Sequence, residues 1–254
     1  MRKSVLVLLF TLLAIVVTAC RISSGSIHES DVNNDQPEST QDKISYDFKS
    51  EAYTYKDSIT VRYPQIINLN DQDKQMKLNE MIKKRAYGYL DNYSTEDMDT
   101  FSLDLNYKVK FKSEHFLSIQ FSGYTYDEGA AHPNDIFYSI NIDMDKSVAL
   151  KLKDMVDIDE EFVTEFREGE LQSTINEQRS TLNEWTDQEW ISMLKDADSR
   201  ESGISSYLTN DSLGISVEVP HAVGDHAELE ISYDEIKQKM NSDIQSKLRG
   251  DITP

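Results

Sequence analysis

The sequence predicts an α+β fold, with a mainly antiparallel sheet or sheets packed against a few amphipathic helices. Three observations predict it. From Tyr46 onward, aromatic and β-branched residues alternate with polar ones over several short segments, as in strands with one buried face. Other stretches place their apolar residues at helical spacing. The strands also come in groups and do not alternate strictly with helices, which argues against a parallel sheet of βαβ units.

The N-terminal half of the globular part, residues 46–128, is predicted to contain two hairpins around one helix. The first hairpin turns at Asp57-Ser58, and Asn70 or Asp71 is a natural N-cap for the helix. The second hairpin has the strictest alternation in the chain and turns near Ser113. In chain order, we expect strands at 53–55 and 59–63, a helix at 71–93, and strands at 101–111 and 117–124.

The C-terminal half, residues 129–250, is predicted to mix short strands with three helices. Acidic residues crowd positions 157–161, where they suit the positive end of a helix and lack the Gly that a calcium loop needs. Thr186 or Asp187 is the expected cap of the second helix. In chain order, we expect strands at 136–144 and 148–152, a helix at 157–178, a second helix from 186, a hairpin at 205–219, a strand at 226–233 and a helix opening at Asp234.

The first nineteen residues are predicted to be a lipoprotein signal peptide. A short basic start precedes an apolar run from Val5 to Val17, which is too short for a comfortable membrane-spanning helix. The run ends in Val17-Thr18-Ala19-Cys20, which resembles the box that directs bacterial lipid attachment. We therefore expect acyl chains such as palmitate on Cys20, the one cysteine of the sequence. An ordinary signal peptide and an uncleaved anchor are the alternatives.

Residues 20–45 are predicted to be a flexible tether, because the segment is rich in Ser and other polar residues and its apolar residues follow no period. The expected location is the extracytoplasmic face of a bacterial cell membrane. Removing residues 1–19 takes away Arg2 and Lys3 and no acid, so the formal charge changes from −20 to −22. Such a surface argues against nucleic acid and favours a cationic partner, if the partner is charged.

No catalytic motif is found, so we expect a protein that is not an enzyme and has no cofactor. Paired carboxylates are too common here to mark a glycosidase, although a cell-wall glycan hydrolase stays an alternative. Trp185 and Trp190 could stack on a sugar, but at helical spacing they are expected to be core and cap residues.

The histidines predict no metal site by themselves. His28 lies in the tether and His115 lies near a hairpin turn. His132 lies in one loop, while His221 and His226 lie in another loop that also holds Asp225. If the two loops met, these groups could bind zinc; otherwise the histidines hold loop backbone by hydrogen bonds.

The least generic stretch runs from Gly123 through Gly129-Ala130-Ala131-His132-Pro133-Asn134 to Asp143. It resembles the signature of the extracellular domains found in the anti-sigma factor RsiV and in the peptidoglycan deacetylase PdaC. The segments at 150–155, 220–224 and 231–236 resemble other sequence motifs of that family, so the likeness covers most of residues 46–240. Ala130 and His221 stand where the family has Gly and Tyr.

This resemblance implies a binding module on a lipoprotein. The candidate ligand-binding or loop residues are Gly129, His132, Pro133, Asn134, His221 and His226. The family's module binds lysozyme in RsiV, which implies a lysozyme-like cationic protein or peptidoglycan as the ligand. The metal-binding Asp-His-His set of the deacetylase is not found, so its activity does not carry over. A structural or accessory envelope lipoprotein without that ligand is the alternative.

Overall fold

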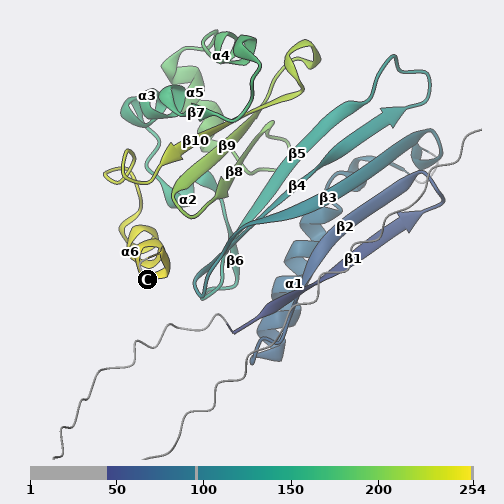
Figure 1. The fold of residues 1–254 in the computed structure, drawn as a ribbon, viewed down its shortest axis with the longest axis horizontal. Coiled ribbons are helices and arrows are strands. Elements are labelled where there is room, and N and C mark those ends of the chain that lie inside the picture. The colour runs from purple at the N-terminus through teal and green to yellow at the C-terminus, as the bar shows by residue number, and fades with distance from the viewer. Residues whose placement is uncertain (1–44, 95–96, 253–254) are drawn as a thin grey trace, which may run out of the picture. The chain divides into compact units, whose positions relative to one another are not determined.

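The computed structural model describes residues 45–94 and 97–252. Within these residues the strands form two sheets, a six-stranded sheet of order β1-β2-β3-β4-β5-β6 and a four-stranded sheet of order β7-β10-β9-β8 (Figure 1). They are called here the first sheet and the second sheet. Among the described strands, β2 and β3 alone pair in parallel, so the predicted α+β class with mainly antiparallel pairing is confirmed.

The first sheet is built from three antiparallel hairpins in sequence order, two of which join at a parallel pair. Its strands are β1 (Asp47–Tyr55), β2 (Ile59–Ile67), β3 (Phe101–Lys112), β4 (Phe116–Asp127), β5 (Asn134–Asp143) and β6 (Val148–Leu150). The helix α1 (Gln72–Ala86) packs against β2 and β5 and buries Leu78 and Ile82 completely. The Asp71 side chain accepts a hydrogen bond from the Lys74 N–H at 3.0 Å, which confirms Asp71 as the N-cap.

The second sheet carries shorter strands and a cover of short helices on its apolar face. The strands are β7 (Glu170–Leu171), β8 (Ile204–Leu208), β9 (Ser212–Glu218) and β10 (His226–Ser232). The helices after the first sheet are α2 (Leu152–Met155), α3 (Glu160–Glu168), α4 (Asn176–Leu182), α5 (Asp187–Lys195) and α6 (Ser242–Ile252). Trp190 of α5 is fully buried, and its ring meets Phe166 of α3 edge-on at 4.9 Å. This aromatic pair is the centre of a second hydrophobic core.

Hydrogen bonds between buried polar groups join the two sheets where β8 meets β4 and β5. The Ser118 hydroxyl donates to Asn141 Oδ1 at 2.7 Å and accepts from the Leu208 N–H at 3.0 Å. Asn141 Nδ2 in turn donates to the Ser206 carbonyl at 2.9 Å. Since Ser118, Asn141 and Ser206 are at most 1 % exposed, these bonds fix the position of β8 against the first sheet.

The helix predicted over residues 157–178 is wrong in its second half. It begins as expected, with the Asp159 side chain capping the Phe162 N–H at 3.0 Å, but ends before Gly169. A Cβ at Gly169 would lie only 3.1–3.2 Å from the carbonyl oxygens of Phe166 and Glu230, so this turn favours Gly. The chain then leaves the helix to form β7 against β10, and α4 follows as a separate helix.

Three other predicted boundaries differ from the structure. The first helix ends at Ala86 and not at residue 93, and Leu152 begins α2 instead of extending a strand. The last helix begins at Ser242 and not at Asp234, because Tyr233 bonds the Thr209 carbonyl at 2.9 Å and Met240 forms a bridge with Val156. The remaining predicted strands, hairpins and the α5 cap at Thr186 are confirmed.

The predicted division at residues 128 and 129 falls in the turn between β4 and β5, inside the first sheet. The change from one sheet to the other comes after Leu150. The predicted signal peptide, Cys20, His28 and residues 20–44 of the tether lie outside the described residues. Among the helices that the structure describes, none is long and apolar enough to cross a membrane.

Candidate functional site

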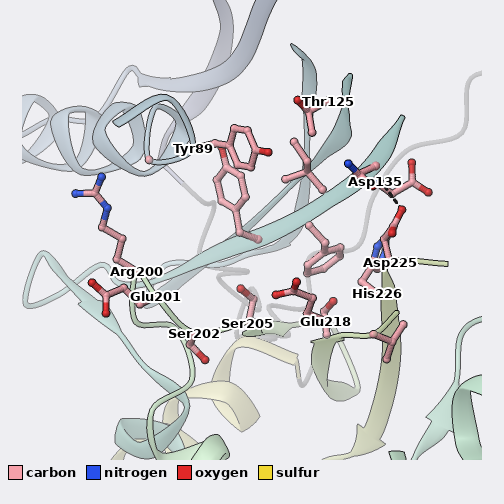
Figure 2. A pocket seen from close by; sticks show the side chains of 18 of the residues that line it. Tyr89, Thr125, Asp135, Arg200, Glu201, Ser202, Ser205, Glu218, Asp225 and His226 are labelled. Atoms are coloured by element: carbon pink, nitrogen blue, oxygen red, sulfur yellow. Dashed lines mark hydrogen bonds between the residues drawn. The ribbon is translucent and has the colours of Figure 1, made fainter. Parts of the chain in front are cut away.

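A cleft of about 600 Å³ lies beside the outer edge of β5, between the end of α1 and the second sheet (Figure 2). Arg85 of α1 and Tyr89 just after it line one side, and Ser205 of β8 and Glu218 of β9 line the other. Phe137 of β5 lies in the wall that connects the two sides. The cleft therefore combines residues from both sheets.

The cleft exists because β6 is much shorter than β5. Only residues 141–143 of β5 pair with β6, so the N-terminal part of β5 has no strand on its outer side within the described residues. The loop at 199–203 lines the opening, and its Arg200, Glu201 and Ser202 side chains are drawn there in Figure 2. A Cβ at Gly203 would lie 2.7 Å from Glu218 Oε2, so a side chain there would displace that carboxylate.

The charged groups of the cleft have both signs. Arg85 Nε donates to the Ser139 carbonyl at 2.7 Å, and its guanidinium lies 5.1 Å from the centre of the Tyr138 ring. Burial lowers the pKa of Arg85, although it stays far above neutral pH. Arg200 is more exposed and lies 3.8 Å from Asp91. Glu218 is exposed, and Glu201 lies beside Arg200 at the rim (Figure 2).

Two tyrosine hydroxyls of the cleft stay neutral at all ordinary pH values. Burial raises the pKa of Tyr138 and of Tyr89, and nearby hydroxyl and carboxylate groups raise that of Tyr89 further. Tyr138 donates its proton to the Ala86 carbonyl at 2.7 Å. Tyr89 accepts from the Tyr93 hydroxyl at 3.3 Å, so its own proton is available to a further acceptor.

Two polar atoms in the wall of the cleft are buried without a hydrogen-bond partner among the described residues. They are Oγ1 of Thr125, a residue 3 % exposed, and Nδ1 of His226. Buried polar atoms are nearly always paired in folded proteins. Both residues line the cleft, but these two atoms are themselves buried and do not face its open space.

The two loops that carry the predicted histidines come together at the mouth of this cleft. The His132 and His221 rings stack with centroids 3.5 Å apart and planes 2° from parallel. His221 Nδ1 lies 2.9 Å from Asp225 Oδ1, and Asp225 Oδ2 accepts the Asp135 N–H at 2.8 Å. Asp225 therefore links the loop after β9 to the start of β5, and the bond that His221 makes here is to this carboxylate and not to loop backbone.

The geometry of the loops does not suit the zinc site that their meeting would allow. A ring nitrogen binds a metal in the plane of its ring, and two parallel rings 3.5 Å apart cannot aim at one ion. Within residues 45–94 and 97–252, no group of three or more His, Cys, Asp or Glu side chains is placed to hold a metal ion.

The other predicted loop residues separate into two groups. Asn134, His221 and His226 line the cleft, whereas Gly129 and Pro133 do not. Gly129 has a φ of +88°, a conformation that favours glycine, and it ends the turn after β4. Trp190 is core as predicted, and Trp185, the residue directly before the α5 N-cap Thr186, is 45 % exposed.

Sequence reasoning missed four charged or aromatic residues of the cleft, namely Arg85, Tyr89, Arg200 and Glu218. Arg85 and Tyr89 lie more than a hundred residues before Arg200 and Glu218 in the sequence, and none of the four belongs to a motif. The single usable signal was the aromatic strand at Phe137, which the sequence analysis placed next to the His132 loop.

The fold is that of an α+β domain built on two sheets, with a cleft where residues of both sheets come together. Residues 48–135 match a family model described as "Deacetylase PdaC", which confirms the predicted resemblance over that part of the chain. The match covers most of the first sheet and reaches the first two residues of β5.

Two crystal structures are similar to this chain over most of its length. One is of a member of the DUF3298 family from Bacteroides fragilis, with a TM-score of 0.51 and 14 % identity, covering 82 % of this chain and 100 % of that one. The other is of a DUF3298 family protein from Pseudomonas aeruginosa, with a TM-score of 0.46 and 17 % identity over 78 % and 94 % of the two chains. At these identities the likeness concerns the fold alone. No curated protein matches the sequence significantly.

Proposed function

We propose that this protein is a lipid-anchored component of the bacterial cell envelope whose cleft binds peptidoglycan without chemical turnover. The observation that carries the binding role is the cleft of about 600 Å³, a volume typical of small-ligand sites. It offers cations, carboxylates, neutral hydroxyls and aromatic rings within one concavity.

Peptidoglycan carries the complementary groups. Its sugars present hydroxyls and acetamides, and its peptides present carboxylates and, in many bacteria, a free amine. Arg200 suits a carboxylate, Glu218 suits an amine, and the Phe137 ring suits the apolar face of a sugar. A ligand of a single charge sign would leave one set of these cleft groups without a partner.

The membrane anchor rests on the sequence of residues 1–20. The apolar run is short, and Cys20 follows a small-residue pair. We expect Cys20→Ala to abolish incorporation of a labelled fatty-acid analogue, because no other thiol is available. Label that persists in this variant would show that the anchor is not on Cys20.

Binding is tested with the full-length chain in detergent, titrated with soluble peptidoglycan fragments that carry both disaccharide and peptide. We expect Arg200→Gln to weaken binding about tenfold, the effect of losing one charge-assisted hydrogen bond. Lys195→Gln in α5 removes the same charge away from the cleft and should leave binding unchanged. Fragments that fail to bind the unmodified chain would refute the proposed function and favour a structural or accessory role.

A lysozyme-like cationic protein is a second candidate partner, because one observation favours it. The chain carries a formal charge of −20, and such a surface attracts cationic proteins most strongly at low salt. Titration with lysozyme at low and physiological salt tests this candidate. Cleavage of peptidoglycan during either titration would instead favour the hydrolase alternative.

A further inference from the structure

The outer edge of β5 presents backbone hydrogen-bonding groups to the cleft. Two of these groups are engaged by side chains from elsewhere in the fold. The Asp135 N–H donates to Asp225 Oδ2 at 2.8 Å, and the Ser139 carbonyl accepts from Arg85 Nε at 2.7 Å. These bonds identify the residues of β5 whose backbone groups point away from β4.

Phe137 lies midway between those two residues. In an antiparallel strand the N–H and C=O of one residue point to the same side, and the side alternates along the strand. Asp135 and Ser139 both face outward, as do Asn141 and Asp143, which pair with β6. The N–H and C=O of Phe137 therefore face the cleft, and neither has a hydrogen-bond partner among the described residues.

The open edge is short. On one side of Phe137, Asp225 bonds the N–H of Asp135; on the other side, Arg85 bonds the carbonyl of Ser139. A long strand cannot pair here without displacing both side chains, whereas a single residue in an extended conformation can exchange two hydrogen bonds with Phe137. The edge thus fits a short peptide.

The groups around Phe137 match a peptide with charges of both signs. Arg200 lies on the 199–203 loop, and Glu218 lies on the facing strand β9, so a carboxylate and an amine would each find an opposite charge.

We propose that the edge of β5 pairs through Phe137 with the peptide stem of peptidoglycan, and this inference rests on the proposed function. Stem peptides mix L and D residues and contain a γ-linked glutamate, so they cannot extend a regular sheet over several residues. One extended residue is enough to bond the N–H and C=O of Phe137. The stem carries the carboxylates that Arg200 would bind and, where its third residue is lysine, the amine that Glu218 would bind.

Three probes are titrated into the full-length chain: the disaccharide without a stem, the free pentapeptide L-Ala-γ-D-Glu-L-Lys-D-Ala-D-Ala, and the disaccharide carrying this pentapeptide. Amide hydrogen exchange at Phe137 is followed in each titration. We expect the two probes with a stem to bind and to slow exchange of the Phe137 N–H at least about tenfold, and the bare disaccharide to do neither.

The outcomes separate this inference from the proposed function. Binding of the bare disaccharide as tightly as the full fragment, with unchanged exchange at Phe137, would overturn the stem inference and leave peptidoglycan binding intact. Failure of all three probes would overturn both. An unrelated all-L pentapeptide that binds as tightly as the stem would show an edge for peptides in general and would overturn the assignment to the stem.

Single N-methylation of the pentapeptide tests the backbone pairing without altering the protein. Each N-methyl group removes one peptide N–H and blocks close approach at that residue. We expect one position to lose binding about tenfold or more, where its N–H would donate to the Phe137 carbonyl, and the other positions to bind as the unmodified peptide does. Equal affinity for all N-methylated peptides would overturn the pairing.

Discussion

The two sheets each have one apolar and one polar face, and they differ in what the polar face meets. On the first sheet, Arg62 pairs with Asp104 across β2 and β3 with both side chains more than a third exposed. On the second sheet, the Tyr207 hydroxyl lies 3.1 Å from Glu228 Oε2 and 3.0 Å from Glu230 Oε1, with Lys110 of β3 above its ring at 4.1 Å. Solvent reaches the polar face of the first sheet at Arg62 and Asp104, whereas protein groups satisfy much of the polar face of the second sheet.

This difference explains where the cleft lies. An apolar face closes against its cover because the free energy gained grows with the area removed from water. A polar face closes only where each group finds a partner, as Ser118, Asn141 and Ser206 do at the junction of the sheets. Stability therefore depends on the two apolar cores, and the cleft lies at the polar junction between the sheets.

The largest expected effect comes from breaking the core of the second sheet. Trp190→Ala removes a fully buried indole whose Nε1 donates to the Leu182 carbonyl at 3.1 Å. We expect the free energy of unfolding to fall by about 3–5 kcal/mol, measured by urea denaturation. Trp185→Ala is the matched control and should change it by less than about 0.5 kcal/mol. A similar loss in both variants would contradict the division between core and surface tryptophans.

A backbone change in the first sheet should cost less. Gly129 has a φ of +88° and open space around its Cα, so the cost of Gly129→Val is conformational strain without a clash. We expect a loss of about 1–2 kcal/mol in thermal or urea unfolding. Gly250→Ala, in α6 and equally open, should stabilise the protein slightly. Unchanged stability in Gly129→Val would show that this turn can relax.

The junction of the sheets should respond to pH through Asp198. Its carboxylate accepts hydrogen bonds from the Leu152 N–H at 2.8 Å and the Ser206 N–H at 2.7 Å, yet burial raises its pKa above the ordinary 3.8. The folded state therefore holds this proton more tightly than the unfolded state. Stability gained through Asp198 is fully present below its unfolded pKa and is lost as pH rises through its folded pKa.

Asp198→Asn isolates that contribution, and Asn suits the φ of +62° at this position. We expect the stability difference between the unmodified chain and the variant to shift in favour of the unmodified chain as pH falls toward 3.8. Urea unfolding at a series of pH values measures it. A difference that is constant with pH would contradict the raised pKa.

The smallest effect is expected at the stacked histidines. His132→Ala removes a ring that is exposed apart from its stack on His221. We expect a stability loss of at most about 1 kcal/mol, unchanged affinity for peptidoglycan fragments, and a non-additive double variant with His221→Ala. Reduced affinity at an unchanged melting temperature would place this loop in the binding surface.

Local patterns predicted most elements of the fold because alternation and capping act over a few residues. The strands of the first sheet, the Asp71 cap and the Thr186 cap were all readable in this way. Boundaries failed where a distant segment decided them. β10 draws residues 170–171 out of the predicted helix, and the Thr209 carbonyl holds Tyr233 out of another.

The cleft was harder to predict because its parts meet only through the tertiary fold. The loops of His132 and His221 were both singled out, but nothing in the sequence stated that they stack. Arg85 is a further example, because in the sequence it is one of several cations in a helix. Its role follows from the Ser139 carbonyl, 54 residues away.

The bond between Asp135 and Asp225 also has a consequence for the order of assembly. It joins residues 90 positions apart, whereas neighbouring strands of the first sheet are mostly joined by short turns. Low contact order favours early formation, so the first sheet should form while the second is still being synthesised. During that interval Asp225 is not yet in place, so the backbone at Asp135 on the outer edge of β5 is open to pairing with another molecule.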